Sequence, residues 1–179
     1  MLWFRTLLAA GCTTLLNCNA GGAALQPYDI TDLGDLPGGG DSSVAMALNS
    51  LGAVVGRSSA SNGGAYIWQD GAMVPLGSLP GGYASSAVDL NGSNQVVGYA
   101  STDGGGVPQP FVWTVDTGMI NIGSTMSLDE GTAAAINAAG VVVGTGRIGS
   151  MDKAFIREAD GDFSFLGWSD EKILPRAIN

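Results

Sequence analysis

The chain has 179 residues, of which 45% are hydrophobic, 13% are charged and 29 are glycine, and its formal net charge is −9. This length suits one domain, and the low charge with many aliphatic residues excludes a disordered chain. The acidic balance argues against nucleic acid and against an anionic membrane surface as partners, since both attract basic proteins.

The first residues follow the pattern of a secretory signal. Arg5 precedes an apolar stretch at 7–16, and small residues follow it. The apolar stretch is too short to span a bilayer, so no membrane span is expected. We therefore predict a signal peptide at 1–24, cleaved after Ala20 or Ala24, and a secreted protein that is extracellular or periplasmic.

Both cysteines of the chain, Cys12 and Cys18, lie inside this segment. The stretch 9–12, Ala-Ala-Gly-Cys, also resembles a lipoprotein processing site, which is the alternative route of maturation. In either case the exported domain is expected to have no disulfide, so packing alone must hold it together.

After the signal, an extended segment at 28–33 is predicted to form a half-buried strand. A Leu-Pro-Gly-Gly-Gly loop follows, and residues 43–48 then alternate with period two before Asn49. Alternation with this period predicts a strand, and both of its faces are apolar or small. We therefore expect the strand at 43–48 to be covered on both sides.

The sequence Asn49-Ser-Leu-Gly52 predicts a turn. Asparagine bonds the backbone two residues on, and glycine suits the fourth position. Further strands are expected at 53–56, 65–68 and 72–76, and the last two are joined by Asp70-Gly71, a dipeptide typical of tight hairpins. The unit therefore reads as four short strands with three turns.

This unit recurs along the chain. The Leu-Gly or Ile-Gly that begins it at 33 returns at 76, 122 and 166, and the asparagine at 49 returns at 91, 137 and 179. Four strands in about 44 residues is the period of a β-propeller blade. We therefore predict an all-β fold of tandem four-stranded antiparallel sheets of propeller type, with repeats at about 33–75, 76–121 and 122–165 and the start of a fourth at 166–179.

Three repeats are fewer than the four to eight or so blades that usually close a propeller. The ring is therefore expected to be incomplete. Three explanations remain open: a fragment of a longer propeller, an assembly of several chains, or an open array of marginal stability.

These motifs resemble the HAF-repeat family of extracellular bacterial proteins. The resemblance rests on Leu-Gly-x-Leu-Pro-Gly-Gly at 33–39 and 76–82, on Val-Val-Gly, and on aromatic segments that end at Trp68 and Trp113. It covers residues 28–179. It implies secretion and a propeller-like β-fold, and it brings no established activity.

The chain departs from that family at the histidine of the family's name. Gly64, Gln109 and Lys153 stand at that position, and the chain has no histidine. A binding role that depended on the histidine would therefore be lost here. Sites that use imidazole, or thiolate in the exported domain, are excluded as well.

The densest acidic cluster is Glu158, Asp160 and Asp162. Alternate residues of a hairpin share a face, so these carboxylates would offer oxygen ligands to Ca²⁺. The alternative, which we favour, is that Asp160-Gly161 simply forms a turn and its neighbours are solvated. No metal, cofactor or catalytic residue is predicted, and Trp68 and Trp113 are assigned a structural role between blades in preference to sugar stacking.

The sequence thus predicts a secreted β-repeat scaffold or interaction module without catalytic activity. Variation concentrates in the loops 57–64, 99–109 and 145–152, and loops on a rigid frame carry binding. The expected partner is a glycan or a protein held by these loops, or another copy of the chain. The alternative is a secreted hydrolase or lyase that uses carboxylates on polysaccharide.

Overall fold

The computed structural model describes residues 29–38, 42–59, 64–102, 106–166 and 174–179, in a chain that divides into two units, 1–31 and 32–179. The predicted signal peptide at 1–24 lies outside the described residues, as do 60–63, 103–105 and 167–173 of the loops and the fourth repeat.

The half-buried strand predicted at 28–33 is wrong for the residues that can be judged. Residues 29–33 form no strand, and the side chain of Ile30 is 97% exposed. An extended segment is stabilised by hydrogen bonds to a neighbouring strand, and no described strand pairs with this one.

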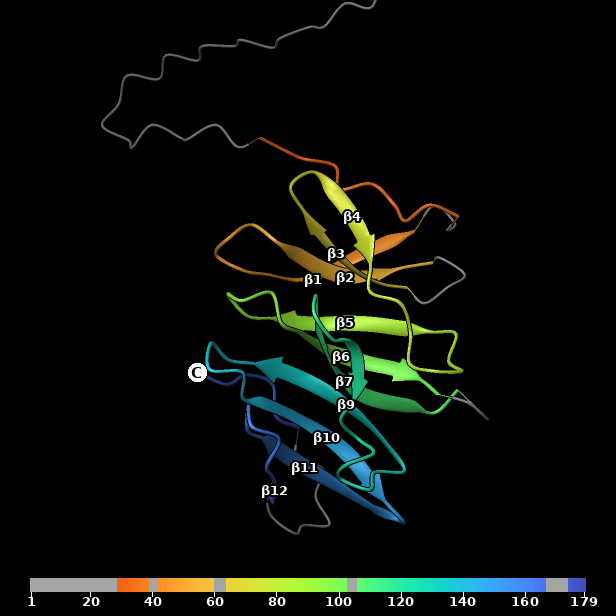
Figure 1. Ribbon diagram of the computed structural model, residues 1–179, viewed down its shortest axis with the longest axis vertical. Helices are drawn as coiled ribbons and strands as arrows, with labels where there is room; N and C mark the ends of the chain where they lie inside the picture. Colours follow the sequence, from red (N-terminus) through yellow and green to blue (C-terminus); the bar gives the residue numbers. More distant parts are fainter. Residues whose placement is uncertain (1–28, 39–41, 60–63, 103–105, 167–173) are drawn as a thin grey trace, which may run out of the picture. The chain divides into compact units, whose positions relative to one another are not determined.

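The second unit contains twelve strands and, in its described residues, no helix. They form three antiparallel four-stranded sheets in which the strand order follows the chain, as Figure 1 shows from orange to blue. The strands are β1 (Ser43–Leu48), β2 (Val54–Ser58), β3 (Ala65–Gln69) and β4 (Ala72–Pro75) in the first sheet; β5 (Ser85–Leu90), β6 (Val96–Ser101), β7 (Pro108–Thr114) and β8 (Gly118–Asn121) in the second; and β9 (Glu130–Ile136), β10 (Val142–Ile148), β11 (Met151–Arg157) and β12 (Phe163–Leu166) in the third.

This architecture confirms the all-β fold of tandem four-stranded sheets, one for each repeat, in a propeller-like and incomplete arrangement. Among the described residues there is no helix with the length and hydropathy that a membrane crossing requires.

Each sheet carries a β-bulge at the same place in its first strand. The pairing with the second strand skips one residue in each repeat: Met46, Val88 and Ala134. A bulge shifts the side-chain alternation by one position, so residues three apart come to share a face. The strict period-two alternation predicted for 43–48 is therefore wrong, because the bulge inserts one residue into the strand.

The glycine of each Val-Val-Gly motif lies where no side chain fits. A Cβ atom on Gly98 would stand 2.1 Å from the carbonyl oxygen of Ser86, and the ring of Phe111 lies beside it in register. Gly56 and Gly144 are equally crowded in the other sheets, where the rings belong to Tyr66 and Phe155. The bulge and the aromatic ring together therefore require glycine.

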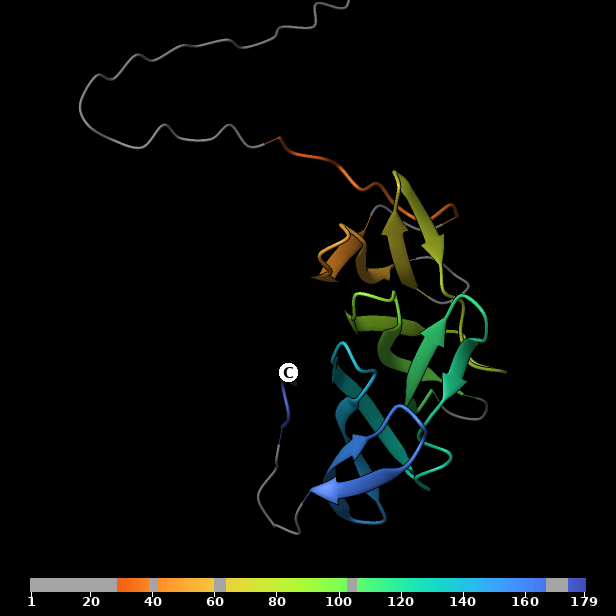
Figure 2. The same ribbon diagram turned by 60° about the vertical axis from the view of Figure 1, so that its left-hand side comes forward.

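Two apolar cores join the three sheets. The first contains Val55 and Ile67 from the first sheet with Leu90 and Phe111 from the second, and the second core lies between the second and third sheets. The turned view in Figure 2 shows the sheets following one another in chain order. The middle sheet is consequently packed on both faces.

The strand β1 is not covered on both sides, which corrects the prediction for 43–48. Leu48 is 73% exposed and Met46 is 52% exposed, whereas Leu90 at the equivalent of Leu48 is 5% exposed. Leu90 packs on the preceding sheet, and no sheet precedes β1 in the described part of the chain. An apolar strand alone therefore does not ensure burial.

Candidate functional site

An asparagine at the same position of each repeat links that repeat to the next. The side-chain oxygen of Asn49 accepts hydrogen bonds from the backbone N–H groups of Leu51 and Ala53, each at 3.0 Å. Its Nδ2 donates to the carbonyl oxygen of Asn91 at 3.0 Å. One side chain thus closes its own turn and fixes the distance to the following sheet.

The same link is repeated twice more. Nδ2 of Asn91 donates to the carbonyl oxygen of Asn137 at 3.1 Å, and Nδ2 of Asn137 donates to that of Asn179 at 3.0 Å. We call Asn49, Asn91, Asn137 and Asn179 the asparagine relay. The sequence predicted the turn at Asn49 and its recurrence in the next two repeats, but nothing in a single unit indicates the bond between repeats.

The second repeat departs from this frame at one turn position. Gly52 and Gly140 occupy that position in the other repeats with φ of 81° and 84°, and Asn94 occupies it here with φ of 56°. Asn94 Oδ1 accepts from Asn49 Nδ2 at 2.7 Å, and Asn94 Nδ2 donates to Gln69 Oε1 at 2.9 Å. Asparagine tolerates left-handed backbone better than most residues, and here its amide bridges two sheets.

A groove of about 590 Å³ lies beside this bridge. Its lining comes from Ile67, Gln69 and Val74 of the first sheet and from the segments 93–95 and 113–116 of the second. Its volume lies within the roughly 300–1,000 Å³ common for small-molecule sites. We call this hollow the junction groove.

Trp113 and Trp68 occupy equivalent positions with different surroundings. Trp113 is half-buried, packs against the core shared by the first two sheets and lines the junction groove. Trp68 is also half-buried but pairs with Val54 on the face that no described sheet covers. Only Trp113 therefore has the position between sheets that the sequence predicted for both.

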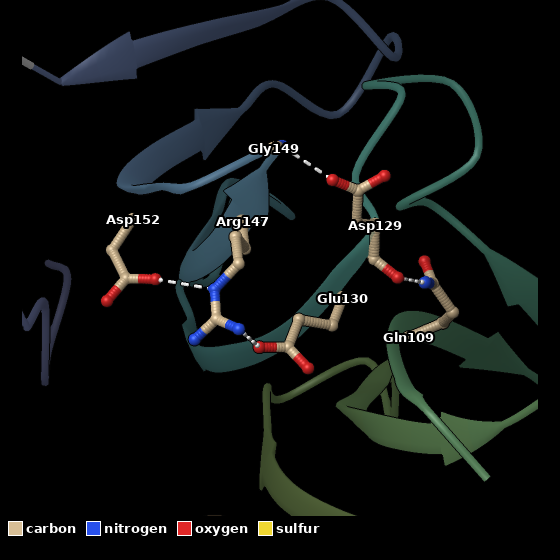
Figure 3. Close-up of polar contacts among 6 residues, drawn as sticks. All are labelled: Gln109, Asp129, Glu130, Arg147, Gly149 and Asp152. Atoms are coloured by element: carbon tan, nitrogen blue, oxygen red, sulfur yellow. Dashed lines mark hydrogen bonds and ion pairs between the residues drawn. The ribbon is translucent and has the colours of Figure 1, made fainter. Parts of the chain in front are cut away.

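The third sheet carries a separate polar cluster, drawn in Figure 3. Arg147 on β10 lies between Glu130 on β9, at 2.9 Å, and Asp152 on β11, at 3.2 Å. The three side chains are between 35% and 47% exposed, and a hollow of about 330 Å³ adjoins them. Cross-strand ion pairs of opposite charge account for this cluster as a feature of the sheet.

Gly64, Gln109 and Lys153, the residues compared above with the histidine of the HAF repeat, are all buried. The side-chain amide of Gln109, a residue 7% exposed, donates through Nε2 to the carbonyl oxygen of Asp129 at 2.8 Å (Figure 3). Its Oε1 is buried with no hydrogen-bond partner among the described residues. Lys153 is likewise 7% exposed, with Nζ 5.5 Å from the ring centroid of Phe165.

The contacts of these buried residues are structural. Gln109 fastens its sheet to the loop that leads into β9, so its contact is structural and crosses from one repeat to the next. A side chain at Gly64 would place Cβ 2.2 Å from the carbonyl oxygen of Ser58. The sequence identified the position but gave no sign that it was buried.

The acids at 158–162 close a hairpin. The carboxylate of Asp160 accepts from the backbone N–H of Asp162 at 3.1 Å, and the N–H of Glu158 donates to the carbonyl oxygen of Asp162 at 2.7 Å. Within the described ranges, no group of three histidine, cysteine or acidic residues is arranged to hold a metal ion. These contacts fit the interpretation as a turn.

No family model, curated protein or solved structure matches this chain.

Proposed function

We propose that the chain is a secreted β-repeat scaffold, related to the HAF-repeat proteins, which binds its partner at the junction groove and the turns that line it and catalyses no reaction. The observation that carries this proposal is the groove itself, which lies where one repeat departs from the repeated frame. Repeat proteins commonly carry their binding residues in loops and turns that differ between repeats, on a frame that stays constant.

The frame has the features that a rigid scaffold needs. Two cores join three sheets, and the asparagine relay ties each repeat to the next by hydrogen bonds. Asn94 is an addition to this frame, because the other repeats have Gly52 and Gly140 at the same position, and the third repeat has Arg157 in place of Trp113. Residues that the frame does not require are available for recognition.

Export of the protein is part of this proposal, with 1–24 as its signal peptide and an extracellular or periplasmic location. Expression of the full chain in a bacterial host, followed by N-terminal sequencing of the exported product, tests it. A product that begins after Ala20 or Ala24 supports export through the general secretory route. An unprocessed chain that stays in the cytoplasm contradicts it.

The rival function is a carboxylate-based hydrolase or lyase that acts on polysaccharide. The full chain is incubated with soluble polysaccharides, and new reducing ends and unsaturated products are measured. We expect no turnover. Turnover that is lost in Glu130→Gln or in Glu158→Gln, at an unchanged melting temperature, would replace the scaffold by an enzyme.

A further inference from the structure

The junction groove combines two kinds of lining. Ile67, Val74 and Trp113 give it apolar surface, and Gln69 and Asn94 add side-chain amides. Aromatic rings stack on the apolar C–H face of a sugar ring, while amides offer both donors and acceptors to its hydroxyls. The groove therefore suits a ligand that is apolar on one face and hydroxylated at its edge.

The charge of the lining narrows the ligand class. Among the described residues no lysine or arginine lines the groove, and the one carboxylate there belongs to the exposed Asp116. An anionic ligand such as a uronic acid, a sulfated sugar or a phosphate would find no cation there. One exposed carboxylate also supplies too few ligands for a metal ion. The lining favours a neutral ligand.

The amides are held in place before any ligand arrives. Asn94 Oδ1 accepts from Asn49 Nδ2, and Asn94 Nδ2 donates to Gln69 Oε1, so the two amides of the groove hold each other. An amide carries two N–H donors and an oxygen with two lone pairs, so these bonds use only part of its capacity. A preorganised site loses less conformational entropy on binding.

This polar set occurs at one junction and is not a by-product of the repeat. At the next junction Gly140 replaces Asn94. A Cβ on Gly140 would already stand 3.2 Å from Gln95 Oε1, so that turn closely approaches the preceding repeat. The frame forms its turn with glycine, and the second repeat gives up this more permissive residue at the groove.

We propose that the junction groove binds a short segment of a neutral polysaccharide, with a sugar ring against Trp113 and its hydroxyls on the amides of Gln69 and Asn94. This inference rests on the proposed function, because it names the partner of the scaffold. It goes beyond that function by fixing the ligand class and the residues that select it.

Affinity electrophoresis of the full chain tests the ligand class. The gels contain xylan, laminarin or galactomannan as neutral polymers, and alginate serves as the anionic control. We expect at least one neutral polymer to retard the chain and alginate to leave its mobility unchanged. The hexasaccharide of the retarding polymer is then titrated by calorimetry.

Two variants test the site. Asn94→Gly restores the residue of the other repeats and removes one amide, so we expect the affinity to fall about tenfold while the turn persists. Trp113→Phe keeps an aromatic ring in the core but shortens the stacking surface, and we expect a loss of about the same size. Gly52→Asn makes the reverse exchange at a turn away from the groove and should leave affinity unchanged.

The results separate three claims: the ligand class, the groove as the binding site, and the scaffold function. If no neutral polymer retards the chain, or if only alginate does, the ligand class is wrong, and the scaffold proposal stands as long as no turnover is seen. If a neutral polymer binds equally well to Asn94→Gly and Trp113→Phe, with melting temperatures that show both variants folded, the site lies elsewhere and the groove proposal is overturned.

Discussion

Leu48 and Leu90 stand at the same place in two successive repeats, one residue before the relay asparagine. Leu48 is 73% exposed, and Leu90 is 5% exposed. The third repeat agrees with the second, since Ile136 is 6% exposed. Leu90 and Ile136 each pack into the core shared with the preceding sheet. Burial at this position is therefore conferred by the neighbouring sheet and not by the strand that carries the residue.

The comparison extends across the whole face. Ala87 and Val96 of the second sheet are fully buried, whereas Ala45 is exposed and Val54 is half-buried in the first. Tyr66 is an exception, because it is only 1% exposed although no described sheet precedes it. The neighbouring loop supplies Asp35 and the buried Leu36, which shows that one loop covers part of what a sheet covers elsewhere.

The largest expected effect comes from truncating the two leucines. Leu90→Ala should lower the free energy of unfolding by about 2–5 kcal/mol, because it leaves a cavity in the first core. Leu48→Ala should change it by no more than about 0.5 kcal/mol, since the side chain is already in water. Urea denaturation of both variants measures the difference. Equal costs would show that another part of the molecule covers β1 in solution.

The exposed β1 also shows where the sequence stops being informative. The repeat period, the turns and the strand positions from 43 onward followed from local patterns, and Asn49-Ser-Leu-Gly52 forms its turn as predicted, with Gly52 at φ of 81°. The exposure of one face of 43–48 could not be predicted from these patterns, because an apolar strand has the same pattern whether or not a second sheet packs on it. The bulge at Met46 was also missed, since an inserted residue leaves the composition of the strand unchanged.

The asparagine relay gives the next largest effect. Asn91→Ala removes both the acceptor that shapes its turn and the donor to Asn137, so we expect a loss of about 1–3 kcal/mol. Asn91→Asp keeps the acceptor and removes the donor. If the link between repeats matters, Asn91→Asp should also lower the free energy of unfolding in urea. Wild-type stability of Asn91→Asp would leave the turn as the only role of this residue.

The candidate site was harder to predict than the frame. Trp113 was noticed because it recurs with Trp68, but recurrence favoured one structural role for both. The sequence did not predict a role for Asn94, because asparagine is common in turns. The partners of Asn94, which are Asn49 and Gln69, are also distant in sequence. The groove is assembled from two repeats, and no pattern within one repeat describes a surface that belongs to both.

Tyr66 gives a pH-dependent test of the loop that covers it. Burial, with the nearby Asp35 as a lesser cause, raises the pKa of Tyr66 above its usual value. The folded state therefore keeps its proton more tightly than the unfolded state. This contribution is complete below about pH 10, where an unfolded tyrosine titrates, and it is lost as the pH rises through the folded pKa.

Tyr66→Phe removes this titration and places phenylalanine at 66, as in the equivalent Phe111 and Phe155 of the other two sheets. We expect the stability of the variant, relative to wild type, to rise between about pH 9 and pH 11 in urea denaturation. A constant difference across that range would mean that the hydroxyl is in water and that the loop with Asp35 does not cover it.

The smallest effect is expected at Arg147, which contrasts with the buried positions. Its ion pairs with Glu130 and Asp152 are about half exposed, so Arg147→Ala should cost only about 0.2–1 kcal/mol at low salt. The cost should shrink further in about 1 M salt, where the screening length is about 3 Å. A larger cost that salt leaves unchanged would show that the aliphatic stem of Arg147 packs on the sheet, and the contribution of this cluster would then come from its apolar contacts and not from its charges.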